Sequence, residues 1–219
     1  MTVVLLTGFE PFDGASTNPS WQAVVQAERR WSGSARLHTA ELPVDFERCG
    51  PTLVEALDEY RPDLVVAVGQ AGGRAGIALE RVAVNIDDAR IPDNAGNQPV
   101  DVPIVEGGPA AYFGTLPVKA CVADLREAGI PAAVSQTAGT FTCNHVFYRL
   151  MHELTARRGA GTGPEPRGGF VHIPFAPEQA SDGRHPSMAV DVSTAALLRI
   201  VDTSLSVTTD RALPGGALH

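Results

Sequence analysis

The chain has 219 residues, 44% of them hydrophobic, which is enough for one sizeable globular core. Its formal net charge of -8 disfavours binding to nucleic acid or to an anionic membrane, because neither polyanion gains from meeting an acidic surface. Three scattered cysteines without a Cys-x-x-Cys pair are too few for a disulfide framework and fit a reducing cytoplasm. The apolar start of the chain lacks a basic leader, so we expect neither a signal peptide nor a membrane span.

Short apolar segments alternate along the chain with segments of helical periodicity. A continuous apolar strand between helices, as in residues 64–68, indicates a parallel sheet that is covered on both faces. We expect residues 1–204 to form a single domain and residues 205–219 a flexible tail. The strand candidates are 3–6, 37–42, 64–68, 77–83, 132–136 and 169–174. The helix candidates are 18–31, 45–60, 116–129, 144–156 and 187–204.

Four loops stand out from this alternation. Residues 7–14 form a glycine- and proline-punctuated loop that leaves two phenylalanines exposed, and residues 157–168 form a flexible loop. The glycine-rich loop 69–76 follows a strand but matches neither a dinucleotide fingerprint nor a P-loop, so no cofactor is expected. Residues 85–103 form a long polar loop, and loops of that length in compact domains are usually functional.

Cys143 lies where the strand candidate 132–136 gives way to the helix candidate 144–156. A side chain at such a corner is near the positive end of the helix dipole and near unpaired backbone N–H groups, which favour thiolate over thiol. The position therefore suits a nucleophile with an oxyanion hole. The alternative is a buried structural cysteine, which is the simplest interpretation of Cys121.

Two further residues are candidates for the same chemistry. His172 is near the carboxyl end of strand candidate 169–174, where it is either a hydrogen-bonded core residue or a general base. Glu80 interrupts an apolar extended segment and could equally be solvated or paired with Arg81. The remaining histidines have no metal-ligand spacing, so no metal is expected.

Taken together, five blocks of the sequence resemble the pyroglutamyl-peptidase I (pyrrolidone-carboxylate peptidase) family of cysteine peptidases. The resemblance covers about the first nine-tenths of the chain, in the family's order. It implies an α/β fold, a single-domain three-layer α/β/α sandwich around an open, mostly parallel twisted sheet. The blocks are Gly8-Phe9-Glu10-Pro11-Phe12 with Asn18-Pro19-Ser20-Trp21, Val68 to Arg74, Leu79 to Ala83 with Asp88 to Asn94, Thr140 to His145, and Phe170 to Phe175.

The same resemblance implies the roles of residues. Cys143 would be the nucleophile, His172 its base and Glu80 the acid that orients the base, with Asp93 as the alternative third member. Backbone N–H groups, helped by Arg90, would stabilise the oxyanion. The substrates would be peptides with an N-terminal pyroglutamate. The substrate pocket would consist of Phe9, Phe12, Ile91 and Phe141 as walls, Asn18 and the Gln70 backbone as polar contacts, and Thr142, where the family commonly has Val.

The family also implies a homo-oligomer, a tetramer or a dimer. Two other interpretations remain open from the sequence. One is a different cysteine-dependent amidohydrolase, for which the apolar pair Phe9 and Phe12 would be unsuited. The other is a non-catalytic binding protein, for which the cysteines would react equally with alkylating agents.

Overall fold

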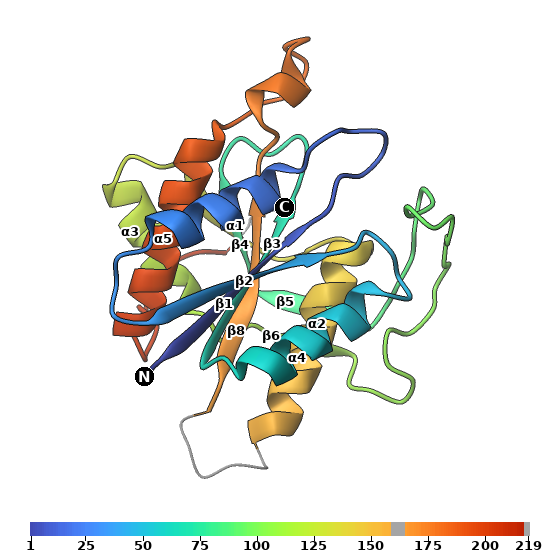
Figure 1. Ribbon diagram of the computed structural model, residues 1–219, viewed down its shortest axis with the longest axis horizontal. Coiled ribbons are helices and arrows are strands. Elements are labelled where there is room, and N and C mark those ends of the chain that lie inside the picture. Colours follow the sequence, from blue (N-terminus) through green and yellow to red (C-terminus); the bar gives the residue numbers. More distant parts are fainter. Residues whose placement is uncertain (159–164, 217–219) are drawn as a thin grey trace.

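The computed structural model describes residues 1–158 and 165–216. A six-stranded sheet with the order β2-β1-β3-β8-β4-β7 forms its centre (Figure 1). Strands β2, β1, β3 and β8 are parallel, whereas β4 is antiparallel to β8 and parallel to β7. The prediction of a mostly parallel sheet is therefore confirmed. The strands are β1 Val3–Phe9, β2 Arg36–Leu42, β3 Leu64–Gln70, β4 Ile77–Glu80, β7 Ala132–Ser135 and β8 Arg167–Ile173.

Helices cover both faces of this sheet, which confirms the predicted three layers (Figure 1). Helices α1, α3 and α5 pack on one face, and α2 and α4 on the other. Strand β3 contributes Val66 and Val68 to the first face and Val65 and Ala67 to the second, so its apolar run serves both cores. The helices are α1 Pro19–Arg30, α2 Cys49–Tyr60, α3 Val118–Glu127, α4 Thr142–Arg158 and α5 Val190–Ser206.

The segment expected as one strand over residues 77–83 is instead divided at Arg81, which corrects that prediction. Its first part is β4, and its second part begins β5 (Val82–Val84), which pairs with β6 (Ala111–Phe113) in a separate two-stranded sheet. The Arg81 backbone binds two neighbours, since its N–H donates to Ser135 O and its C=O accepts from Gly114 N. Glu80 thereby becomes the last residue of its strand.

The predicted start of α1 is confirmed in detail. Asn18 is the N-cap residue, and its Oδ1 accepts hydrogen bonds from the Ser20 N–H at 3.0 Å and the Ser20 hydroxyl at 2.8 Å. Pro19 occupies the first turn, where a missing N–H costs nothing. The Asn18 Nδ2 group donates to Glu10 O at 2.9 Å, so the cap also fixes the loop before α1.

Part of the segment expected as a flexible tail, residues 205–219, is attached to the domain. Helix α5 extends to Ser206, and the Asp210 carboxylate accepts the backbone N–H groups of Lys119 and Ala120 at 3.1 and 2.9 Å in the first turn of α3. The expected loop 157–168 is also shorter, because residues 157–158 end α4 and 167–168 begin β8. Residues 159–164 and 217–219 lie outside the described residues. Within the described ranges, none of the helices has both the length and the apolarity to cross a membrane.

Candidate active site

Cys143 is the second residue of α4, so the thiol lies in the first helical turn as the sequence predicts. The first helical hydrogen bond runs from His145 N to Phe141 O at 3.1 Å. The N–H groups of Thr142, Cys143 and Asn144 precede that bond and have no carbonyl acceptor within the helix. These donors point out of the positive end of the helix and could stabilise a negatively charged oxygen beside the thiol.

The Cys143 side chain packs against the end of β3. A Cβ atom added to Gly69 would lie 2.8 Å from Cys143 Sγ and 2.8 Å from the Phe170 ring, so a hydrogen atom is all that this position accommodates. Gly69 is the register partner of His172 in the β3–β8 pair. The thiol therefore lies beside the strand pair that carries the histidine, although β7, the strand that precedes α4 in the chain, is at the far edge of the sheet.

His172 and Glu80 form a buried pair across the antiparallel strands β8 and β4. His172 Nδ1 and Glu80 Oε1 are 2.8 Å apart, and the two residues are 3% and 1% exposed. Because an ionised carboxylate only accepts hydrogen bonds, Nδ1 carries the hydrogen and Nε2 keeps a free lone pair. The pair thus fixes the tautomer that a general base requires.

Asp93, the alternative partner of the histidine, has its own set of donors. Its carboxylate accepts hydrogen bonds from the N–H groups of Phe46, Ala95 and Asn97, and from Asn97 Nδ2, at 2.8–3.1 Å. Burial alone would raise the pKa of Asp93, but these N–H donors together hold it below its usual value. The geometry assigns Asp93 to the long loop rather than to His172.

Replacing Asp93 with Ala is expected to lower the free energy of unfolding by about 2–3 kcal/mol at pH 7, since charge-assisted hydrogen bonds are lost. A carboxyl group whose pKa is lower in the folded than in the unfolded state stabilises the fold at pH values above its unfolded-state pKa. This contribution is lost as the pH falls through the folded-state pKa. The difference from the wild type should therefore shrink under acid conditions. Urea unfolding at pH 7 and in steps toward pH 3 measures both effects. Asp88→Ala, an exposed change in the same loop, is the control, and an equal loss in both variants would contradict the assignment.

The protonation state of the thiol differs from the sequence-based expectation. Burial, followed by the Glu80 carboxylate, raises the pKa of Cys143 to about 12, although Arg74 opposes them. Burial also lowers the pKa of His172, against the Glu80 hydrogen bond and charge that raise it. The expected lowering of the Cys143 pKa is therefore not supported, and both shifts favour a neutral thiol beside a neutral imidazole. Cys143 still differs from Cys49 and Cys121, which are fully buried, because its side chain is partly exposed.

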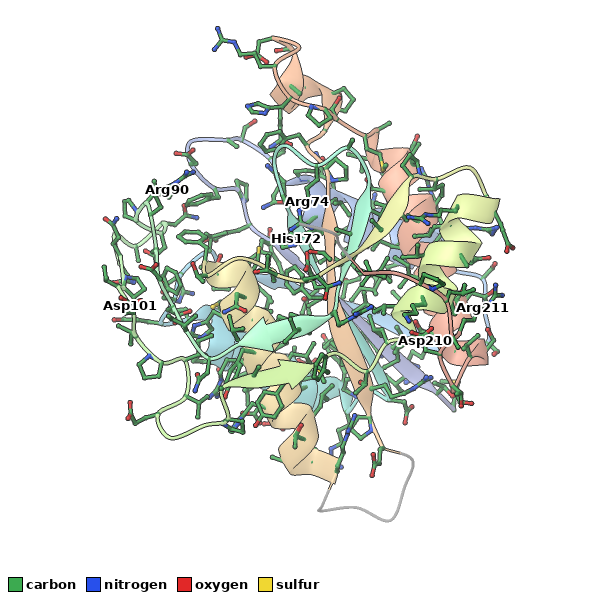
Figure 2. All side chains as sticks on the ribbon, turned by 180° about the vertical axis from the view of Figure 1, so that it is seen from behind. Arg74, Arg90, Asp101, His172, Asp210 and Arg211 are labelled. Carbon is green, nitrogen blue, oxygen red and sulfur yellow. The ribbon has the colours of Figure 1, made fainter. Side chains whose placement is uncertain are left out.

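A cavity of about 670 Å³ opens at Cys143, within the range of small-molecule sites. Six residues of the predicted substrate pocket line it, whereas Arg90 and Ile91 do not, and Figure 2 shows Arg90 near the edge of the molecule, away from His172. The rings of Phe12 and Phe141 are 5.3 Å apart. The predicted residues that line the cavity with Cys143 are Phe9, Phe12, Asn18, Gln70, Phe141 and Thr142.

Several residues of the site carry no clear signal in the sequence. The Arg74 Nη1 group donates to Glu80 Oε1 at 3.0 Å, although the two belong to different segments. His145 Nδ1 lies 2.8 Å from Asp87 Oδ2, and this contact ties α4 to the long loop. Spacing alone could not reveal these pairs, because each depends on the fold. The cavity is also lined by Val44, Gly72, Phe175, Glu178 and Gln179.

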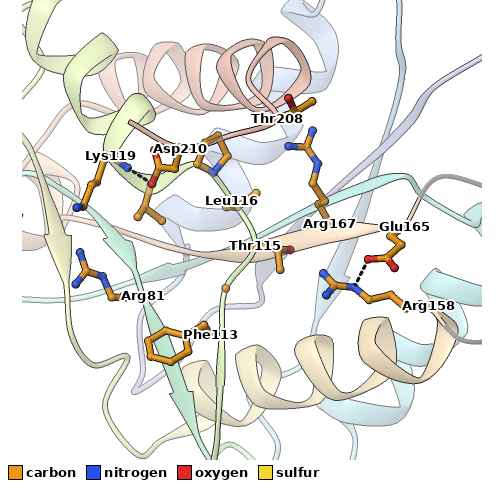
Figure 3. A pocket seen from close by; sticks show the side chains of 13 residues that line it. Arg81, Phe113, Thr115, Leu116, Lys119, Arg158, Glu165, Arg167, Thr208 and Asp210 are labelled. Atoms are coloured by element: carbon orange, nitrogen blue, oxygen red, sulfur yellow. Dashed lines mark hydrogen bonds and ion pairs between the residues drawn. The ribbon is translucent and has the colours of Figure 1, made fainter. Parts of the chain in front are cut away.

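A second cavity, of about 580 Å³, lies apart from these residues (Figure 3). Arg81 and Lys119 face it, Arg158 is 3.5 Å from Glu165, and the Arg167 guanidinium donates to Val207 O at 2.9 Å. Among the described residues, those that line this cavity include neither cysteine nor histidine. Among residues 1–158 and 165–216, no cluster of three or more His, Cys, Asp or Glu side chains could hold a metal ion.

A cysteine at a helix N-terminus, beside a buried histidine–carboxylate pair on an α/β/α sandwich, defines the class of cysteine hydrolases. Comparison with known proteins narrows this class. The pyroglutamyl peptidase family model matches residues 2–206. Pyrrolidone-carboxylate peptidases of Clavibacter michiganensis and Erwinia tasmaniensis are 55% and 54% identical, over the full length of both chains. The chain belongs to the pyroglutamyl peptidase family and is a cysteine-type peptidase.

Solved structures agree with this assignment. The crystal structure of Bacillus amyloliquefaciens pyroglutamyl peptidase I has a TM-score of 0.90 at 46% identity, covering 96% of this chain and all of the other. The pyrrolidone carboxyl peptidase from Thermococcus litoralis has a TM-score of 0.87 at 40% identity, covering 94% of each chain. The similarity thus includes the sheet and helices that carry the site.

Proposed function

We propose that this protein is an omega-peptidase that removes an N-terminal pyroglutamyl (5-oxoprolyl) residue from peptides. Cys143 is the nucleophile, His172 the general base and then acid, and Glu80 the residue that orients His172. The observation that carries this proposal is the 2.8 Å contact of His172 Nδ1 with Glu80, beside a thiol that opens into an aromatic cavity. The names of the similar proteins support the same substrate class.

The reaction begins from the neutral pair. As the sulfur of Cys143 bonds to the carbonyl carbon of the pyroglutamyl residue, its proton passes to His172 Nε2, and the carbonyl oxygen becomes an oxyanion. The N–H groups at the start of α4 donate to that oxyanion. The imidazolium then protonates the departing amine, which leaves a thioester. His172 takes a proton from water, whose oxygen attacks the thioester, and free pyroglutamate and the thiol are released.

The cavity suits the chemistry of the pyroglutamyl ring, which is a flat, uncharged lactam. Phe9, Phe12 and Phe141 supply apolar walls for its faces. Asn18 and Gln70 supply polar groups for its N–H and C=O, although the Asn18 side chain also caps α1. A free glutaminyl end would place a charged amine against the aromatic walls, and the cost of removing that charge from water would exclude it.

The proposed function also involves the long loop and the oligomeric state of the protein. Arg90 and Ile91 belong to the long loop and would contact substrate only after that loop moves toward Cys143. The catalytic domain, which we expected to end at residue 204, extends at least to Asp210 and belongs to a cytoplasmic homo-oligomer, a tetramer or dimer. Size-exclusion chromatography with light scattering would measure the oligomeric state. No nucleic acid, membrane or cofactor takes part in the proposed reaction.

Release of aminomethylcoumarin from its pyroglutamyl, prolyl and glutaminyl derivatives tests the function. We expect turnover of the pyroglutamyl compound alone, because the prolyl and glutaminyl ends each carry a charged amine. Release from the glutaminyl compound instead would favour another cysteine amidohydrolase. A folded protein that turns over none of the three would contradict the proposed peptidase activity.

A further inference from the structure

Arg74, in the glycine-rich loop, contacts two other parts of the active site, the end of β4 and the segment before α4. Its Nη1 group donates to Glu80 Oε1 at 3.0 Å, and its Nη2 group donates to Thr137 O at 3.2 Å. The first contact reaches the end of β4, and the second reaches the segment that leads into α4 and Cys143. Figure 2 shows Arg74 next to His172. The planar guanidinium is suited to such a double contact, because its donors have fixed directions.

The charge of Glu80 makes this contact important. The Glu80 side chain is fully buried, its Oε1 atom accepts from both His172 and Arg74, and its Oε2 atom has no partner among the described residues. A buried carboxylate is costly unless a positive charge compensates it. His172 is neutral in the resting state, so Arg74 is the fixed positive charge in contact with Glu80. The Arg74 side chain is 31% exposed and therefore lies on the solvent side of the pair.

Two glycines before Arg74 constrain the backbone conformation of the loop. Gly73 has a φ of +81°, in the left-handed region that favours glycine. A Cβ atom on Gly72 would lie 2.3 Å from the Phe175 ring, which requires the loop to pass directly beneath that ring. Both constraints fix the direction in which the chain leaves the loop. The side chain of Arg74 therefore extends from a backbone whose conformation is constrained.

We propose that Arg74 is a positioning residue of this active site. It holds the Glu80 carboxylate against His172 and joins the glycine-rich loop to the segment before Cys143. Arg74 does not line the substrate cavity, so it acts through Glu80 and His172 rather than on the substrate. Its role in turnover rests on the proposed function, whereas its effect on the thiol and imidazole does not.

The positive charge of Arg74 predicts the direction in which its removal should shift the protonation of the His172–Glu80 pair. Two charged groups act on the protonation of His172, namely Glu80 from β4 and Arg74 from the glycine-rich loop, and the same two groups act on Cys143 from α4. Glu80 raises the pKa of His172, and Arg74 lowers it. Removing Arg74 takes a positive charge away from the His172–Glu80 pair, so the pair as a whole should bind a proton at higher pH. Removing Glu80 should move protonation the opposite way.

Kinetics of four proteins test the positioning role, namely the wild type, Arg74→Ala, Arg74→Lys and Arg81→Ala. For Arg74→Ala we expect kcat to fall about 10–100-fold with KM within about threefold, and the acid limb of kcat/KM to move to higher pH. Arg74→Lys keeps the positive charge but lacks the planar guanidinium that donates to two acceptors at once. It should therefore return the acid limb to its wild-type position but recover only part of kcat. Arg81 is the matched control, since it follows Glu80 directly but faces the second cavity, and its variant should behave as wild type.

Alkylation of Cys143 by iodoacetamide, followed by mass spectrometry, gives a readout that needs no turnover. Arg74 lowers the pKa of Cys143, so Arg74→Ala should slow alkylation at a given pH by at least about threefold, and Arg81→Ala should not. Thermal unfolding establishes that each variant is folded, and Arg74→Gln replaces Arg74→Ala if the latter does not fold. An unchanged kcat and acid limb, or equal effects of the Arg74 and Arg81 variants, would overturn the proposal. An inactive wild type whose alkylation still depends on Arg74 would contradict the peptidase function alone.

Discussion

Replacing Cys143 with Ala should reduce kcat/KM for a pyroglutamyl substrate by at least about 10⁴-fold, equivalent to about 5.4 kcal/mol of transition-state stabilisation. The alanine lacks the sulfur that forms the acyl bond, and no other cysteine lines the cavity. Cys143→Ser should be almost as inactive, because a hydroxyl gives up its proton far less readily than a thiol. Release of aminomethylcoumarin from the pyroglutamyl derivative, at enzyme concentrations high enough to detect residual turnover, measures the loss.

Cys121→Ala is the matched control for this change. Its thiol is buried between α3 and α5, where Sγ lies 3.9 Å from Ile200 O, on the other face of the sheet from Cys143. Its removal should lower stability by about 1 kcal/mol and leave kcat unchanged. The Cys143 variants should unfold within about 1 kcal/mol of wild type, because the side chain is only partly buried. Substantial turnover by a purified Cys143→Ala protein would exclude the thioester mechanism.

Replacing Glu80 with Gln is expected to lower kcat by about 10²–10⁴-fold, with a smaller change in KM. The amide is close to the carboxylate in shape but cannot stabilise the imidazolium that forms when His172 takes the thiol proton. It can also rotate to present its NH₂ group to Nδ1, which would favour the wrong tautomer. Steady-state kinetics at saturating substrate separates this loss from weaker binding.

The pH dependence of Glu80→Gln should differ from that of the wild type in a predictable direction. Burial lowers the pKa of His172, and the hydrogen bond and charge of Glu80 raise it, so removing Glu80 lowers it further. The acid limb of kcat/KM should therefore move to lower pH in Glu80→Gln than in the wild type. Glu55→Gln, an exposed change on α2, should leave the profile unchanged. A shift of the limb to higher pH would mean that another group controls it.

Features with local causes could be predicted from the sequence. The Asn18 cap and Pro19 define the start of α1 within the chain segment itself, and the continuous apolar run of β3 indicates a strand buried on both faces. The position of Cys143 in the first turn of α4 follows from the same kind of signal. Each depends on residues that are neighbours in the sequence, which is why the pattern suffices.

Features with long-range causes could not be predicted. The division at Arg81 depends on backbone partners at Ser135 and Gly114, and the direction of β4 is set by its place between β8 and β7. The contact between Glu80 and His172 spans 92 residues of sequence, so only the resemblance to a family suggested it. The expected thiolate at Cys143 followed from the helix terminus alone, whereas the partial burial and the nearby Glu80 carboxylate that raise its pKa are properties of the assembled fold.

Gly69 has a consequence for experiments that map tolerance to substitution. Its hydrogen atom faces Cys143 Sγ and the Phe170 ring, so every other residue type would push the sulfur or the ring aside. A saturation scan scored by activity would therefore rank position 69 with the reacting residues, although glycine has no functional group to contribute. In this protein, a position that tolerates no change can mark a place that must stay empty.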